Sequence, residues 1–225
     1  MFEPFSDVAA EPKIRGFLHT PAKPSAGIVL THGAGANCQS KLLIEVSEAF
    51  AAAGYFALRM DLPFRIERPH GPPSPHGAAR DREGLRRAVA LLKEKVRGPI
   101  FLGGHSYGGR QSTMLAAEDS QLVDALLLLS YPLHPPRKLE QLRTSHFPKL
   151  KTPAFFVSGT RDPFGTTADL ESALKLIPAA HALHEVEGAG HDLAIKKSFG
   201  DLPPRVVSEF QAFVEKSAKH AKAAK

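Results

Sequence analysis

The chain has 225 residues, 43% of them apolar, a net charge of +6 and a single cysteine. Its length and apolar content predict one domain, residues 1–225, that buries a single core. One cysteine excludes an internal disulfide, and no apolar run approaches a membrane span. The lysine-rich tail at 216–225 carries four lysines and no acid, and no nucleic-acid-binding motif accompanies the charge. With no signal segment, we expect a cytoplasmic protein without nucleic-acid or membrane partners.

The first buried strand is predicted at residues 26–30, Ala-Gly-Ile-Val-Leu. It runs into the loop Thr31-His32-Gly33-Ala34-Gly35-Ala36-Asn37, whose small residues allow close approach of the backbone to another group. Neither a Gly-Lys-Ser/Thr nor a G-x-G-x-x-G pattern occurs here, so the nucleotide-binding fingerprints are lacking. Cys38 follows and is expected to be a small packing residue at the start of a helix.

Helices at 41–53 and 80–96 alternate with a strand at 55–60, which predicts a mainly parallel sheet covered on both faces. The proline-rich segment 62–77 leaves the carboxyl end of a strand, and we expect it to be a loop beside a pocket. Its arginines, Arg65 and Arg68, are expected to stay in solvent.

The next strand, Ile100-Phe101-Leu102, leads into Gly-Gly-His-Ser-Tyr-Gly-Gly and a helix at 107–117. This is the context of a nucleophile elbow, a sharp strand-to-helix turn that exposes a serine, here Ser106. Side chains two residues before and after the serine would clash, which explains Gly104 and Gly108. The amide of Tyr107 is placed to face a developing negative charge.

A serine hydroxyl needs a base, and the base needs a carboxylate that orients it. Beyond a strand at 124–130, a strand at 152–157 ends in a polar turn with Asp162, and a strand at 181–186 ends in Glu-Gly-Ala-Gly-His with His191. We therefore predict Ser106 as nucleophile, His191 as base and Asp162 as acid. Ala34 and Tyr107 are predicted to supply the two amides of an oxyanion hole.

Each of these assignments has an alternative. Asp162 precedes a proline and has the sequence context of a simple turn residue, while Asp192, next to His191, is the competing acid. Asp169 and Glu187 rank lower. His181 and His184 lie in a predicted strand without metal-ligand spacing, so we expect no metal and no cofactor. The closing helix is predicted at 203–216.

Over nearly its whole length the chain resembles the α/β-hydrolase superfamily, on the residues of the His-Gly-Ala-Gly loop, the Gly-His-Ser-Tyr-Gly turn, the Asp162 turn and the Gly-Ala-Gly-His loop. The stretches at 126–135 and 156–159 resemble a small lid-less family that includes a testis-expressed hydrolase-like protein and a subunit of the NSL histone-acetyltransferase complex. The dienelactone hydrolases are more distantly similar. This resemblance implies an α/β-hydrolase fold, and the roughly twenty residues after Ser130 leave no room for a cap domain.

The residues favour a serine hydrolase acting on a small carboxylic ester or thioester through an acyl-enzyme on Ser106. The alternative is a binding or scaffold protein that keeps the fold with little activity. A peptidase would use the same residues but usually brings a propeller or cap domain, and non-hydrolytic chemistry such as cofactor-free haloperoxidation stays open.

Overall fold

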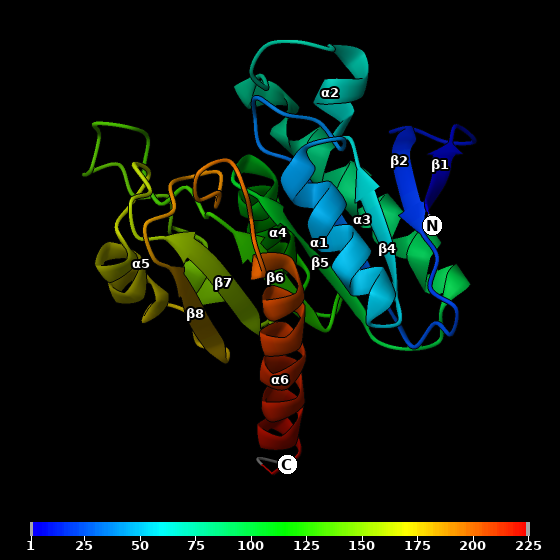
Figure 1. The fold of residues 1–225 in the computed structure, drawn as a ribbon. Helices are drawn as coiled ribbons and strands as arrows, with labels where there is room; N and C mark the ends of the chain where they lie inside the picture. Colours follow the sequence, from blue (N-terminus) through cyan, green and yellow to red (C-terminus); the bar gives the residue numbers. More distant parts are fainter. Residues whose placement is uncertain (1, 224–225) are drawn as a thin grey trace.

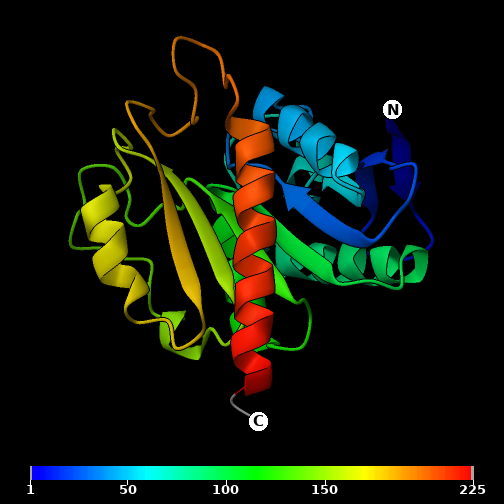
Figure 2. The same cartoon turned by 60° about the horizontal axis from the view of Figure 1, so that its bottom comes forward.

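The computed structural model describes residues 2–223 as one eight-stranded sheet between two layers of helices (Figures 1 and 2). The order across the sheet is β1-β2-β4-β3-β5-β6-β7-β8. The strands are β1 (Phe2–Asp7), β2 (Ile14–His19), β3 (Ala26–Thr31), β4 (Tyr55–Met60), β5 (Ile100–His105), β6 (Ala125–Leu129), β7 (Ala154–Gly159) and β8 (His181–Val186). The strands from β4 to β8 pair in parallel, whereas β1 and β2 are antiparallel at one edge. The predicted, mainly parallel sheet is confirmed.

Helices cover both faces of this sheet. They are α1 (Lys41–Ala52), α2 (Pro63–Glu67), α3 (Ala78–Lys95), α4 (Tyr107–Glu118), α5 (Thr167–Leu174) and α6 (Leu202–Ala223), with the short 3₁₀ helices η1 (Pro75–Gly77) and η2 (Phe147–Lys149). Buried side chains of α1 and α6 pack on one face, and those of α3, α4 and α5 pack on the other. The segment between β6 and β7 holds no domain of its own.

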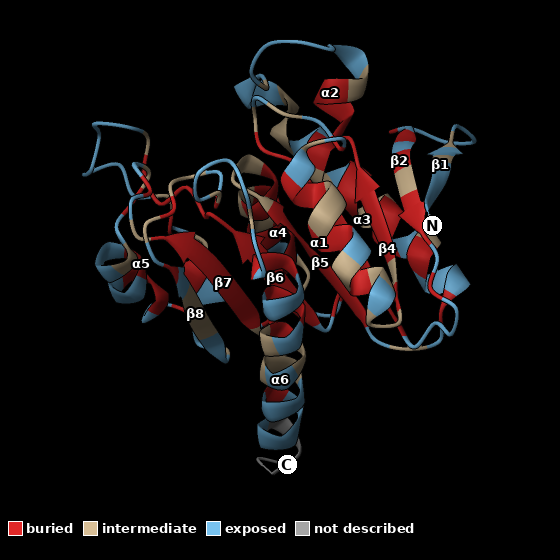
Figure 3. Ribbon diagram, viewed as in Figure 1, coloured by how far each residue is buried: buried red, intermediate tan, exposed pale blue. Residues whose placement is uncertain are grey.

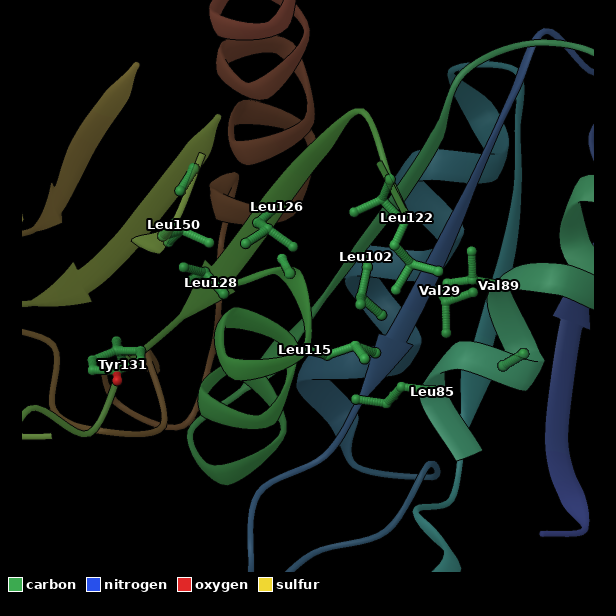
Figure 4. Close-up of a cluster of buried hydrophobic side chains, with 14 of the residues drawn as sticks. Val29, Leu85, Val89, Leu102, Leu115, Leu122, Leu126, Leu128, Tyr131 and Leu150 are labelled. Atoms are coloured by element: carbon green, nitrogen blue, oxygen red, sulfur yellow. The ribbon is translucent and has the colours of Figure 1, made fainter. Parts of the chain in front are cut away.

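The core consists of two apolar clusters, one on each face of the sheet. The strands in the middle of the sheet are largely buried (Figure 3). Successive side chains of a strand point to opposite faces, so a central parallel strand needs apolar residues at every position. β6 meets this requirement, since Leu126 and Leu128 face α4 and Leu127 and Leu129 face α6. Figure 4 shows the cluster on the face that α4 covers, with Leu115 of α4 beside the sheet.

Most element predictions hold to within two or three residues, and those at 55–60 and 181–186 match the observed strands. β1, β2, α2, α5 and the two 3₁₀ helices were not predicted, and segment 62–77, expected to be a loop, contains α2 and η1. The C-terminal helix extends to Ala223, past the predicted end at 216, and Ala224 and Lys225 lie outside the described residues. Within residues 2–223 no helix is both long and apolar enough to cross a bilayer.

Cys38 is buried before α1, as expected of a packing residue. Burial and the neighbouring Asp61 carboxylate raise the pKa of its thiol to about 12. The group therefore stays protonated at neutral pH, and a thiol is a far weaker nucleophile than a thiolate.

The prediction that both arginines of segment 62–77 stay in solvent is wrong for Arg65. This side chain is only 3% exposed, whereas Arg68 is exposed. The Arg65 guanidinium donates to the carbonyls of Ala34, at 2.7 Å, and Ala36, at 2.8 Å. A guanidinium has five N–H donors in a fixed geometry, so a buried one is stabilised by hydrogen bonds to backbone carbonyls. These hydrogen bonds connect Arg65 of α2 to the loop that follows β3.

Three buried or partly buried histidines make stability depend on pH. Burial lowers the pKa of His19, His105 and His146 from 6.5 to about 4. Below pH 6.5 these histidines become protonated in the unfolded chain but stay neutral in the folded one. Their contribution to the free energy of unfolding is therefore complete above about pH 6.5 and falls between pH 6.5 and 4. Urea unfolding across this range should show a shallower fall for His146→Gln than for the parent. His181→Gln, at an exposed position, is the control, and equal slopes for all three proteins would contradict the assignment.

Candidate active site

Ser106 lies on a tight turn between β5 and α4. Its backbone has φ 52° and ψ −115°, a left-handed φ that is uncommon for a residue with a side chain. A Cβ on Gly104 would collide with the Thr31 carbonyl oxygen of β3, and one on Gly108 would lie 2.7 Å from the His32 carbonyl oxygen. The glycines on either side of the serine are therefore required by the close approach of β3, which holds the turn in its strained form.

Ser106, His191 and Asp162 form one hydrogen-bonded chain. The Ser106 Oγ lies 2.8 Å from His191 Nε2, and His191 Nδ1 lies 2.8 Å from Asp162 Oδ2 and 3.0 Å from Oδ1. The three residues follow β5, β8 and β7, at the carboxyl ends of parallel strands, which meet at one edge of the sheet. The structure thus brings together the three side chains that the sequence selected.

Asp162 is 5% exposed, and its Oδ1 also accepts the Phe164 amide at 2.8 Å. The turn-residue interpretation and the interaction with His191 therefore both apply to it. Asp192 is exposed and accepts the Ala194 amide instead. Asp169 caps α5 through Thr166, and no hydrogen bond joins either carboxylate to His191 within residues 2–223.

Two side chains that the sequence analysis did not single out fix the position of His191. The Phe164 ring lies over the imidazole, with centroids 4.1 Å apart and an interplanar angle of 32°. His105 Nε2 donates to the His191 carbonyl at 2.7 Å. Burial lowers the pKa of His105 to about 4, so its ring stays neutral and adds no positive charge beside His191 at neutral pH.

The loop after β3 is held by His32, which is completely buried. His32 Nε2 accepts the Leu62 amide at 3.1 Å, so Nδ1 carries the proton and donates to the Gly33 carbonyl at 2.8 Å. In a trans peptide the C=O and N–H point in opposite directions. By holding the Gly33 carbonyl, His32 sets the direction of the Ala34 N–H in the same peptide unit. Burial lowers the pKa of His32, which preserves this neutral form.

Ala34 and Tyr107 both line the cavity that contains Ser106. Across residues 2–223, neither backbone amide donates to another protein group. The carbonyl of Ser106, in the same peptide as the Tyr107 N–H, accepts the Arg110 amide at 3.0 Å. The Tyr107 hydroxyl donates to buried Asp81 at 2.8 Å, which holds the side chain. Two oriented, unused donors therefore border the serine.

The cavity has a volume of about 830 Å³, within the range of small-molecule sites. Its walls come from the loop after β3, segment 72–75, the first turns of α4, and single residues from later loops. Part of the proline-rich segment thus lines the pocket, as expected. The lining residues are Gly33, Ala34, Gly35, Ala36, Pro72, Pro73, Ser74, Pro75, Ala78, His105, Ser106, Tyr107, Arg110, Gln111, Met114, Pro132, Arg143, Phe164 and His191.

The two histidines of β8, His181 and His184, do not line the cavity. His184 pairs with Glu209 at 2.7 Å, and exposed His181 contacts the Ala179 carbonyl. Among the described residues, no group of three His, Cys, Asp or Glu side chains is arranged to hold a metal ion.

A family model described as "Alpha/beta hydrolase domain" matches residues 24–219. Among solved structures, a dienelactone hydrolase from Anabaena variabilis is 21% identical with a TM-score of 0.74, and the match covers 93% of this chain and 95% of that one. Est1E from Butyrivibrio proteoclasticus is 15% identical with a TM-score of 0.73, covering 94% and 99%. An alpha-beta serine hydrolase homologue from Coxiella burnetii is 16% identical with a TM-score of 0.71, covering 95% and 96%. At such identities these likenesses show the fold alone, which is the predicted one, without a cap domain.

Proposed function

Because the chain belongs to the alpha/beta hydrolase domain family, we propose that it is a serine hydrolase that cleaves a small carboxylic ester or thioester through an acyl-enzyme on Ser106. The hydrogen-bonded chain from Ser106 through His191 to buried Asp162, at the wall of a substrate-sized cavity, is the observation that carries the proposal. The name of the similar dienelactone hydrolase is compatible with this chemistry.

In the proposed acylation step, His191 Nε2 takes the Ser106 proton while Oγ attacks the substrate carbonyl carbon. The carbonyl oxygen becomes negative and accepts hydrogen bonds from the Ala34 and Tyr107 amides, a contribution of roughly 3 kcal/mol per donor in comparable sites. Collapse of this intermediate breaks the bond to the alcohol or thiol. That leaving group takes the proton from His191, and the acyl group stays on Ser106.

Deacylation repeats these steps with water. His191 removes a proton from a water molecule that attacks the acyl carbonyl, and the same proton then returns to Ser106 Oγ as the acid departs. Asp162 accepts a hydrogen bond from the protonated Nδ1 throughout, so that Nε2 is the nitrogen free to act as base. It also stabilises the imidazolium that forms transiently.

We further propose that the chain is related to the lid-less family that includes the NSL-complex subunit, and that it acts in the cytoplasm. These finer assignments rest on the sequence resemblance and on the single cysteine. The scaffold alternative predicts a serine without enhanced reactivity, whereas the proposed hydrolase predicts an activated one.

Labelling with a fluorophosphonate separates these alternatives. An activated Ser106 Oγ attacks phosphorus and displaces fluoride, so the parent protein should be labelled on the peptide that contains Ser106, and the Ser106→Ala variant should not. Heat-denatured protein is the control for non-specific reaction. Absence of any label on the folded parent, or a label that persists in Ser106→Ala, would overturn the proposed function.

A further inference from the structure

Two arginines line the cavity beside Ser106 without an acidic partner. The Nε of Arg110 is buried and has no hydrogen-bond partner within residues 2–223. In the described part of the chain, the Arg143 guanidinium donates only to the Pro132 carbonyl, at 3.4 Å. Neither guanidinium forms an ion pair among the described residues. Both arginines are partly buried, and a buried donor such as Arg110 Nε that lacks an acceptor costs free energy.

Other buried or partly buried arginines have hydrogen-bond acceptors in the described structure. Arg59 donates to His19 and to the Cys38 carbonyl, and Arg65 donates to backbone carbonyls. Arg82, on α3 next to the cavity, pairs with Glu118 at 3.0 Å. The missing acceptors are thus a property of the cavity wall and not of arginines in this fold.

A third unused donor lies on the same wall. Gln111 follows Arg110 in α4, lines the cavity and is completely buried. Its Oε1 accepts from Arg82 at 3.1 Å, and since a guanidinium can only donate, this contact fixes which end of the amide is the oxygen. Gln111 Nε2 is left with no partner in the described structure.

Among the described residues, no aspartate or glutamate lines the cavity to compensate this positive charge. Two carboxylates that contact lining residues are engaged, Asp162 with His191 and Asp81 with Tyr107. Arg110 and Arg143 are close enough that Arg110, after burial, lowers the pKa of the Arg143 guanidinium. His146, behind this wall, is neutral at pH 7 because burial and Arg110 lower its pKa to about 4.

We propose that the substrate carries an anionic oxygen group, a carboxylate or a phosphate, a few bonds from its scissile carbonyl, and that Arg110, Arg143 and Gln111 bind this group. An anion is the ligand that satisfies donors of this kind, and each hydrogen bond from a guanidinium to it is charge-assisted. The inference rests on the proposed ester hydrolysis, for which it names the class of substrate.

The placement on α4 brings the proposed anion site close to the nucleophile. Arg110 lies one helical turn from Ser106, since its amide donates to the Ser106 carbonyl at 3.0 Å, which corresponds to a backbone rise of about 6 Å along the helix. A short diacid half-ester is a simple substrate with an anion a few bonds from its scissile carbonyl. Monoethyl glutarate is a suitable probe, with ethyl glutaramate as its neutral match and ethyl 4-phosphonobutanoate as the phosphorus analogue.

The parent protein should hydrolyse at least one of the two anionic esters with a kcat/KM about 30-fold or more above that of ethyl glutaramate. The anionic ester with the higher kcat/KM shows whether the site prefers a carboxylate or a phosphorus-centred anion. The ratio of anionic to neutral ester should fall by at least about tenfold in Arg110→Gln and in Arg143→Gln. Arg205→Gln, which removes an equal charge from the exposed side of α6, should keep the parent ratio. Thermal melts verify that each variant is folded.

Binding to the Ser106→Ala variant tests the anion site without turnover. Calorimetry should give tighter binding of an anionic ester than of ethyl glutaramate, and the difference should be lost when Arg110→Gln is added. Equal or better binding and turnover of the neutral amide would overturn the inference. Hydrolysis of neutral 4-nitrophenyl butyrate by the parent measures the proposed function independently, so an esterase without anion preference is distinguished from an anion site without esterase activity.

Discussion

Replacing Ser106 by alanine is expected to reduce the hydrolysis of short activated esters by at least about 10⁴-fold, because no acyl-enzyme can form without the hydroxyl. The oxyanion donors and His191 would remain, so a small residual rate over that in water is expected from them. Turnover of 4-nitrophenyl butyrate, measured with enough enzyme to resolve a residual rate, gives the ratio of the two kcat/KM values.

The fold should survive this change. Alanine and serine meet the same steric restriction at φ 52°, so the backbone strain of the turn is unaltered, and only one hydrogen bond, to His191, is removed. Ser112→Ala is a matched control because it removes a hydroxyl from α4, the helix that follows Ser106, where the hydroxyl donates to the Gly108 carbonyl. Its turnover should stay close to that of the parent. If Ser106→Ala keeps most of the parent activity, the nucleophile has been misassigned.

The residues of the hydrogen-bonded chain could be selected from the sequence because each belongs to a local pattern. Ser106 is flanked by glycines that a tight turn demands, and Asp162 and His191 each follow an apolar strand. Parallel strands deliver their carboxyl ends to one edge, so the order of elements along the chain is enough to bring these side chains together.

The groups that support them could not be predicted in this way. His105 contacts the backbone of a residue 86 positions away, and His32 fixes a peptide through a contact to Leu62. From the sequence alone, a histidine or an arginine can be placed equally well in solvent, in the core or in a functional site, because its hydrogen-bond partners are not known. Arg65 shows this limit, since a residue type that is usually exposed is here buried against carbonyls of a distant loop.

Three of the elements that the sequence left unassigned, β1, β2 and α5, lie toward the ends of the sheet. β1 is largely exposed, so its residues carry no apolar alternation of the kind that marks a half-buried strand. α5 has eight residues, and its N-terminal capping box, Thr166 with Asp169, was considered only as a source of a competing carboxylate. Whether such short elements form depends more on tertiary packing than on the local preference of their residues.

Asp162→Asn is expected to lower turnover by about 10⁴-fold, whereas Asp192→Asn should change it by less than about threefold. An asparagine at 162 can present its NH₂ to Nδ1, which favours the tautomer with the proton on Nε2. The nitrogen that faces Ser106 Oγ at 2.8 Å then cannot accept its proton. The steric change is small, and the turn bond from the Phe164 amide to the side-chain oxygen can be kept.

Asp192 offers a control next to His191 in sequence and equal in charge. It is exposed and accepts the Ala194 amide, a bond that asparagine retains through its own oxygen. A surface carboxylate this close to the site contributes only a screened electrostatic effect. The two variants therefore differ in whether the carboxylate orients the imidazole, not in the charge removed. Comparable losses in both would show that net negative charge near His191 matters more than orientation, and a larger loss in Asp192→Asn would transfer the role of the acid to Asp192.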